Sequence, residues 1–113
     1  MSKFKSTRIQ DRTEFGQDGH KIVFKEYFPE TDTYVYCRYS GGYLSTYEVV
    51  RPKYIMQDGE RIGVFPSSSD WGHLGMTVIA GTRYARKEID FLVSTKDWSS
   101  ENLFKFRKSL KVN

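Results

Sequence analysis

Tyrosines beside an arginine are the first candidates for chemistry in this sequence. Successive side chains of a strand point to opposite faces, so Tyr34, Tyr36 and Arg38 share one side of a strand predicted at residues 33–39. Rings next to a guanidinium on an exposed sheet face can stack unpaired nucleic-acid bases, at about 1–3 kcal/mol per base. The alternative is that these rings pack in the core, because tyrosine is also a good strand former. The residues that could extend this face are Tyr43, Tyr47, Arg51 and Lys53.

The C-terminal segment offers a second set of binding groups. From Leu103 onward the chain carries four basic residues and no acidic one. In a helix, Leu103, Phe106 and Leu110 form an apolar spine, and the cations occupy the remaining arc. This strip could approach phosphates or an acidic protein surface, or it could simply be a solvated helix face. The predicted nucleic-acid contacts here are Lys105, Arg107, Lys108 and Lys111.

A loop at residues 66–75 contains a tryptophan that could anchor a partner protein. Trp, Tyr and Arg carry much of the binding energy of protein interfaces, so Trp71, with Tyr43 and Tyr47, is a predicted partner-binding residue. The same loop holds Ser, Asp and His, the residue types of a catalytic triad. A triad needs side chains that converge from different elements, so hydrogen bonds that cap the loop explain these residues better.

The sequence predicts no catalytic, metal or cofactor site. His20 and His73 have no metal-ligating partner three or four residues away. Cys37, in the middle of a strand, is expected to pack as a small hydrophobe rather than to act as a nucleophile. No glycine-rich phosphate loop precedes a helix. We therefore expect a non-enzymatic binding protein.

Composition limits the class of protein. The 113 residues carry a formal charge of +4 and include 16% aromatic residues, which is typical of a folded domain rather than of a disordered chain. We predict a single domain over residues 1–113, in which residues 1–16 form an extended arm or an edge strand. The lone Cys37 and the lack of a long apolar run favour a reducing, cytoplasmic location without membrane contact.

Turn signals followed by alternating apolar residues predict an α+β fold. Asp-Gly pairs, which favour tight hairpins, precede two of the strand-like segments. The predicted architecture is an antiparallel β-meander of four to five strands between about residues 20 and 80, with C-terminal helical segments packed on one face. In the first long strand we expect Ile22, Phe24 and Phe28 on one side and Tyr27 on the other.

Local signals also place the breaks between elements. Pro52 has no amide donor, so the strand ahead of it must bulge, lie at an edge, or end and restart at Tyr54. Residues 83–93 fit either a helix or an alternating strand, and we take the helix. Ser99 or Ser100 is expected to cap a final helix.

Two hairpin signals resemble each other. Residues 57–65 repeat the pattern of residues 17–24, apart from one additional glycine, Gly63. The similarity could mark a duplicated unit. However, Asp-Gly followed by a strand containing Ile, Val and Phe is common hairpin chemistry, and we prefer that interpretation.

Two main functional hypotheses follow. In the first, the chain is a small protein that binds nucleic acid through the predicted aromatic and basic sheet face and the basic C-terminal helix. In the second, it is a protein–protein interaction module, such as an inhibitor or an accessory subunit, whose exposed Trp and Tyr residues dock a partner with an acidic surface. A third class is an enzyme using Asp70 and His73. The sequence favours no particular oligomeric state.

Overall fold

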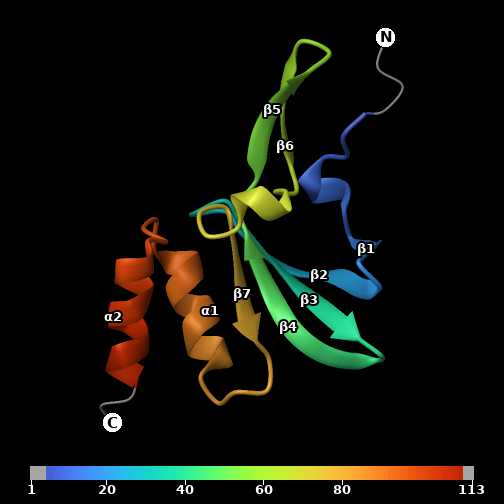
Figure 1. Cartoon of the computed structure of the whole chain (residues 1–113). Coiled ribbons are helices and arrows are strands. Elements are labelled where there is room, and N and C mark those ends of the chain that lie inside the picture. The colour runs from blue at the N-terminus through green and yellow to red at the C-terminus, as the bar shows by residue number, and fades with distance from the viewer. Residues whose placement is uncertain (1–4, 111–113) are drawn as a thin grey trace.

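The structure is an antiparallel sheet with helices on one face and a separate hairpin (Figure 1). The computed structural model describes residues 5–110. The five-stranded sheet has the order β1-β2-β3-β4-β7, and a two-stranded sheet contains β5 and β6, which confirms the predicted α+β class. The elements are η1 (Ile9–Asp11), β1 (Glu14–Gln17), β2 (His20–Phe28), β3 (Thr33–Ser40), β4 (Tyr43–Val50), β5 (Lys53–Gln57), β6 (Glu60–Val64), η2 (Ser68–Asp70), β7 (Gly75–Ile79), α1 (Ala85–Ser94) and α2 (Ser100–Leu110), of which η1 and η2 are short 3-10 helices.

Two Asp-Gly turns set the register of the hairpins. Asp18 and Asp58 have φ of 52°, and Gly19 and Gly59 have φ of 78°. Positive φ at both central residues is the signature of the type I′ turn, whose twist matches that of the flanking strands. The β1–β2 and β5–β6 hairpins are therefore built alike locally. They belong to different sheets, which favours shared hairpin chemistry over a duplicated unit.

The glycine that interrupts this similarity has a steric role. Tyr54 of β5 pairs with Gly63 of β6. A Cβ at Gly63 would lie 2.9 Å from Cβ of Pro52 and 3.1 Å from Cε1 of Tyr54. Because Gly63 has no side chain, the ring of Tyr54 can lie against it at the base of the hairpin.

A β-bulge in β2 changes which side chains share a face. The pairing with β3 shifts register between Phe24 and Glu26. As a result, Tyr27 pairs with Tyr34 on the same face as Phe24, while Phe28 packs against the helical layer. The expected grouping of Phe28 with Phe24, and of Tyr27 on the opposite side, is wrong, because strict alternation requires a ladder without an inserted residue.

The C-terminal helices cover one face of the sheet (Figure 1). α1 settles the choice between helix and strand in favour of a helix, and it buries Ala85, Ile89 and Leu92. The backbone N–H of Asn102 donates to Oγ of Ser99 at 3.2 Å, so a serine does cap the start of α2. The apolar cluster under the helices consists of Val35, Val49, Val78, Ala85, Ile89, Leu92, Trp98 and Leu103.

The opposite face of the sheet has a core of its own. Segments distant in sequence cover it, namely η1 and the loop that follows β6, and Phe15 of the edge strand β1 packs beside them. The buried members of this second cluster are Ile9, Ile22, Tyr34, Tyr36 and Val50, and Phe15, Phe65 and Trp71 pack against them. Both faces of β3 are therefore buried over residues 33–36, and the tyrosine face is not left to solvent there.

The β5–β6 hairpin projects from the rest of the molecule (Figure 1). Of the alternatives left open at Pro52, the structure shows an end and a restart: β4 ends at Val50, and β5 begins at Lys53, one residue before the expected Tyr54. The radius of gyration of 15.1 Å exceeds the value of about 13 Å for a compact chain of this length. N-terminal residues run beside the hairpin, where Nζ of Lys5 lies 2.9 Å from the carboxylate of Asp58.

Candidate functional site

The predicted stacking face is covered. Tyr36 is completely buried and Tyr34 is 8% exposed. The ring centroid of Tyr36 lies 5.9 Å from that of Phe15 and 5.4 Å from that of Phe65, and its hydroxyl donates to the carbonyl of Ile9. Of the two alternatives drawn from the sequence, core packing is therefore the one observed for Tyr34 and Tyr36, and the exposed stacking face is wrong, because N-terminal residues and the segment after β6 pack on this face.

Arg38 lies farther along the same face and lines a small pocket. The pocket has a volume of about 320 Å³ and is lined by Gln17, Asp18, Arg38, Glu48, Ser68, Trp71 and Thr77. Glu48 is buried, and its two carboxylate oxygens accept hydrogen bonds from Thr46 at 2.6 Å and from Thr77 at 3.0 Å. These donors offset part of the cost of burying a charge. Sequence reasoning missed Glu48, because strand alternation does not distinguish a buried acid from an exposed one.

Arg51 and Lys53, which could have extended the stacking face, have structural roles instead. Nε of Arg51 donates to the hydroxyl of Thr33 at 3.0 Å, and its Nη2 donates to backbone carbonyls at the end of α1. Nζ of Lys53 lies 3.5 Å from the carboxylate of Asp70. Both cations are thus engaged within the chain.

Part of the basic strip on α2 is neutralised by ion pairs. Nζ of Lys105 lies 3.4 Å from the carboxylate of Glu101 in the same helix. Arg107 donates two hydrogen bonds to Oε1 of Glu88 in α1, at 3.0 and 2.6 Å. Lys108 is exposed. The remaining predicted contact, Lys111, lies outside the described residues.

The structure does not bring the two parts of the predicted nucleic-acid interface together. Tyr34 and Tyr36 belong to the cluster on one face of the sheet. Leu103 anchors α2 in the cluster on the other face. A single-stranded nucleic acid bound along the basic strip of α2 would therefore lie on the side of the sheet away from these rings.

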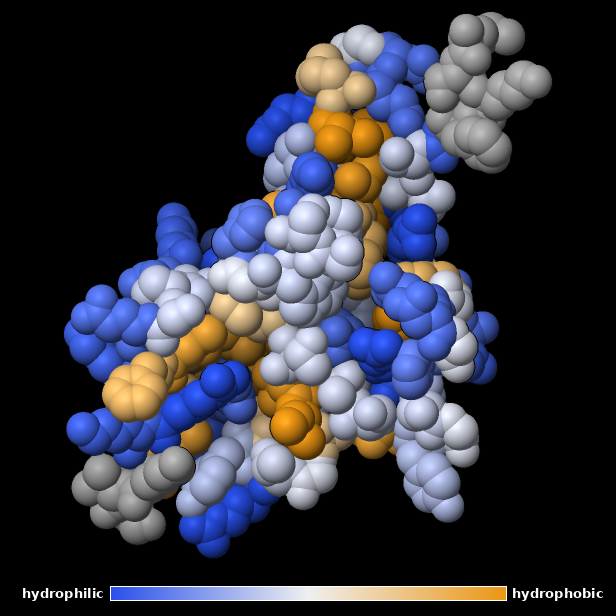
Figure 2. Space-filling model, in the orientation of Figure 1, coloured by the Kyte–Doolittle hydropathy of each residue, from blue (hydrophilic) through white to orange (hydrophobic). Residues whose placement is uncertain are grey.

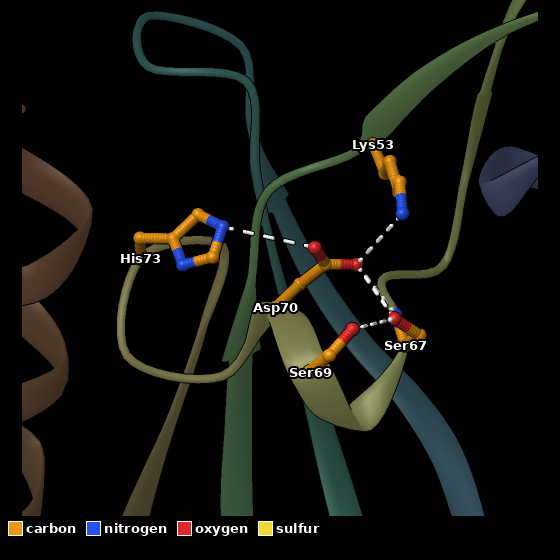
Figure 3. Close-up of polar contacts among 5 residues, drawn as sticks. All are labelled: Lys53, Ser67, Ser69, Asp70 and His73. Atoms are coloured by element: carbon orange, nitrogen blue, oxygen red, sulfur yellow. Dashed lines mark hydrogen bonds and ion pairs between the residues drawn. The ribbon is translucent and has the colours of Figure 1, made fainter.

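Ser67, Asp70 and His73 are neighbours but do not form a catalytic chain (Figure 3). Ser67 donates both its backbone N–H and its hydroxyl to Oδ2 of Asp70, each at 2.9 Å. Nε2 of His73 lies 3.7 Å from the other carboxylate oxygen. A triad needs the histidine between the serine and the acid, so these contacts are those of a capping box on η2. The hydrogen bonds from Ser67 hold the pKa of Asp70 below its usual value.

The predicted partner-binding residues differ in exposure. Tyr43, where β4 begins, is 80% exposed, whereas Tyr47 packs partly against the helical cluster. Trp71 is half-buried, and its Nε1 donates to the hydroxyl of Thr77 at 3.0 Å. A Cβ on Gly75 would lie 2.6 Å from the indole ring. Trp71 therefore closes its loop over the sheet rather than standing free as an anchor.

A different group of large side chains is exposed on β2 and on the β5–β6 hairpin. Four of them, Phe24, Tyr27, Tyr54 and Met56, are 37%, 40%, 45% and 67% exposed, and Arg61 beside them is exposed as well. We call these five residues the hairpin patch. In Figure 2, apolar residues are visible along the projecting hairpin with polar residues beside them.

Direct contacts make the hairpin patch one surface. Phe24 and Tyr27 of β2 pack on the ring of Tyr34, with centroid distances of 6.3 and 4.4 Å. Tyr54 and Met56 alternate along β5 and so share a face of the hairpin. Arg61 pairs with Met56 across the hairpin, and its guanidinium lies 4.0 Å from the centroid of the Tyr54 ring.

Asp32 joins the two parts of the hairpin patch. Its carboxylate accepts a hydrogen bond from the hydroxyl of Tyr27 at 2.9 Å and another from the hydroxyl of Tyr54. The hydrogen bond to Asp32 is the main cause that raises the pKa of Tyr54 to about 12. Burial, followed by the bond to Asp32, raises the pKa of Tyr27 to about 12. Both phenols are therefore neutral and fixed in position near pH 7.

Replacing Asp32 by Asn is expected to lower the pKa of Tyr54, and to a smaller extent that of Tyr27, toward the usual value of about 10. The reason is that a neutral amide no longer disfavours the phenolate. In the wild-type protein, the stabilisation from these bonds is present below about pH 10 and is lost as the pH rises toward 12. Titration of phenolate absorbance measures the shift, with Tyr27→Phe and Tyr54→Phe variants to assign the midpoints. Unchanged midpoints in Asp32→Asn would contradict the assignment.

Neither metal-ligating side chains in the described residues nor known relatives indicate a function for the chain. Within residues 5–110, no group of three or more His, Cys, Asp or Glu side chains is placed to hold a metal ion. None of the helices in the described part of the chain is long and apolar enough to cross a membrane. Comparison of the chain with protein-family models, with curated proteins and with solved structures gives no match.

Proposed function

We propose that this chain is a protein–protein interaction module that docks a partner protein on the hairpin patch. The observation that carries the proposal is that Tyr27 and Tyr54, from two separate sheets, are both exposed and both bonded to Asp32. The partner presents an apolar surface with a carboxylate for Arg61. By occupying that surface, the chain acts as an inhibitor or as an accessory subunit.

The composition of the hairpin patch supports this proposal. Aromatic residues, Met and Arg are enriched at protein interfaces, whereas Lys, Glu and Asp are depleted. The patch consists of one Phe, two Tyr, one Met and one Arg. Asp32, the acidic residue that bonds to the patch, has both carboxylate oxygens occupied by the tyrosine hydroxyls.

The rigidity of the hairpin patch also supports the proposal. Ordering a mobile side chain at an interface costs about 0.5–1.5 kcal/mol. Here Asp32 already holds Tyr27 and Tyr54, and Arg61 already stacks on Tyr54. Docking would therefore order few side chains that are not already in place. The projection of β5 and β6 away from α1 and α2 gives a partner access to the hairpin without contact with the helices (Figure 1).

Nucleic-acid binding, the first hypothesis from the sequence, stays a prediction with less support. Tyr34 and Tyr36, the rings predicted to stack on bases, are buried and cannot contact a nucleic acid. Two of its predicted cations, Lys105 and Arg107, are paired with acids of the same chain. Affinity capture with and without nuclease therefore distinguishes a nucleic-acid ligand from a protein partner.

Replacing Arg61 by Ala, or Tyr27 by Ala, is expected to weaken partner binding by about tenfold or more, because each variant removes one anchor of the patch. Affinity capture from an extract of the native cells, with and without nuclease, identifies the proteins that the wild-type chain retains. Titration of the purified partner against each variant then gives the change in Kd.

The matched control is Arg83→Ala. Arg83 is exposed and its guanidinium also lies over a tyrosine ring, 4.7 Å from the centroid of Tyr84, but it is not part of the patch. It should bind the partner as the wild type does. Equal retention by Arg61→Ala, Tyr27→Ala and Arg83→Ala would contradict the proposal. Retention that disappears in every arm treated with nuclease would favour nucleic acid as the ligand.

A further inference from the structure

One edge of the hairpin is unpaired. β5 pairs with β6, and Arg8 forms a bridge with Val64 on the far side of β6, so the N-terminal segment covers that side. Lys5 and Ser6 hold the same segment against the hairpin tip through Asp58 and Gln57. No strand within residues 5–110 pairs with the other edge of β5. A row of backbone N–H and C=O groups therefore remains open on that edge.

The turn determines which residues present these groups. In a two-residue type I′ hairpin, the residues that flank the turn, here Gln57 and Glu60, form a hydrogen-bonded pair. Such pairs alternate with non-hydrogen-bonded pairs, so Ile55 also bonds to β6, whereas Tyr54 and Met56 do not. The backbone N–H and C=O groups of Tyr54 and Met56 consequently point outward from the free edge.

The centre of this edge carries no charged residue or proline that would block pairing. Exposed edges are commonly blocked by charged residues, proline or a bulge within the strand. β5 has Lys53 only at its first position, and Pro52 precedes the strand. Its central residues, Tyr54, Ile55 and Met56, are large and uncharged.

We propose that two copies of this chain pair antiparallel through the free edges of β5, across a two-fold axis at Ile55. In this register Tyr54 lies opposite Met56 of the second copy, and their outward groups form about four backbone hydrogen bonds across the axis. The register places no like charges opposite each other, because Lys53 meets Gln57 of the second copy. The Met–Tyr pairs add favourable contacts between sulfur and aromatic rings.

The pairing uses the edge of the hairpin and leaves the face of the hairpin patch open. Because paired residues of an antiparallel ladder share a face, Tyr54 and Met56 of both copies would lie on one side of a four-stranded sheet. In each copy the hairpin projects from the five-stranded sheet and the helices (Figure 1), so pairing of the hairpins keeps these parts of the two copies apart. The dimer therefore presents two copies of the patch side by side. The inference does not depend on the function proposed above.

Measurement of mass as a function of concentration, by sedimentation equilibrium of the full chain, tests the proposal. The wild-type chain is expected to form dimers. Ile55→Lys and Ile55→Glu should each raise the dimer dissociation constant at least tenfold, because each places like charges opposite each other on the axis. An equal mixture of the two variants should restore dimers, because the charges then attract.

A second pair of variants covers the case in which substitution of Ile55 disturbs the hairpin. Met56→Pro removes an outward N–H and leaves the pairing with β6 intact, so it should prevent dimerisation. Met56→Ala keeps that N–H and should still dimerise. A monomeric wild-type chain would overturn the proposal, and so would dimers that persist in Met56→Pro. Arg61→Ala, which weakens the proposed partner docking, should dimerise normally, so the two proposals can fail separately.

Discussion

Tyr36→Ala is expected to lower the free energy of unfolding by about 4 kcal/mol, the cost typical of truncating a large buried ring. Tyr36 has no solvent exposure and packs edge-on against Phe15, Phe24 and Phe65. Its loss leaves a cavity between the sheet and the segments that cover it. A melting temperature lower by on the order of 15 °C would be the direct measurement.

Tyr36→Phe is the matched control. It keeps the ring and removes only the hydroxyl, which donates to the carbonyl of Ile9 at 3.3 Å, so the expected cost is about 1 kcal/mol. The two variants distinguish a core residue from an exposed stacking residue, because replacing an exposed ring by Ala changes stability by roughly 0.5 kcal/mol or less. A change of that size in Tyr36→Ala would mean that this face is open.

The elements of this fold could be predicted because local signals determine them. Asp18-Gly19 and Asp58-Gly59 favour positive φ at both turn residues, and both form type I′ turns. The apolar spacing of Ala85, Ile89 and Leu92 gives α1 a buried stripe. In each case residues that are close in sequence provide the structural cause.

The cover of the tyrosine face of the sheet could not be predicted, because it depends on residues distant in sequence. Along β3, Tyr34 and Tyr36 alternate with Val35 and Cys37, and both sets are apolar enough to be buried. Which set meets solvent depends on where the segments outside the meander pack. Ile9 and the rings that follow β6 cover the tyrosines, and no pattern within β3 indicates this.

The hairpin patch could be predicted only in part. Met56 and Arg61 sit on either side of the Asp-Gly turn, so strand pairing alone puts them together. The approach of Tyr27 depends on the β-bulge in β2, which shifts it to the face of Phe24. Its link to Tyr54 depends on Asp32, in the turn between β2 and β3, and this contact joins separate sheets. Neither the bulge nor the contact has a local sequence signal.

The second large effect is expected at Arg51, which ties the helical layer to the sheet. Its guanidinium donates to the hydroxyl of Thr33 and to the carbonyls of Leu92 and Thr95, and it stacks 4.1 Å from the ring centroid of Trp98. Carbonyls at the C-terminal end of a helix have no partner within the helix and carry partial negative charge. Arg51 therefore caps α1 and holds it against the sheet.

Arg51→Ala is expected to cost about 3 kcal/mol of unfolding free energy, because several charge-assisted hydrogen bonds are lost. The carbonyl of Leu92 keeps one donor, Nε1 of Trp98, at 2.9 Å. Arg51→Lys should recover only part of this loss, since one ammonium group cannot reproduce the planar set of donors. Thermal unfolding gives the energies, and amide hydrogen exchange should show faster opening in α1 and α2 than in β2 and β3. Arg83→Ala, at an exposed stacked arginine, should change stability little. If Arg51→Ala and Arg83→Ala were equally mild, the helical layer would be held by its apolar contacts alone.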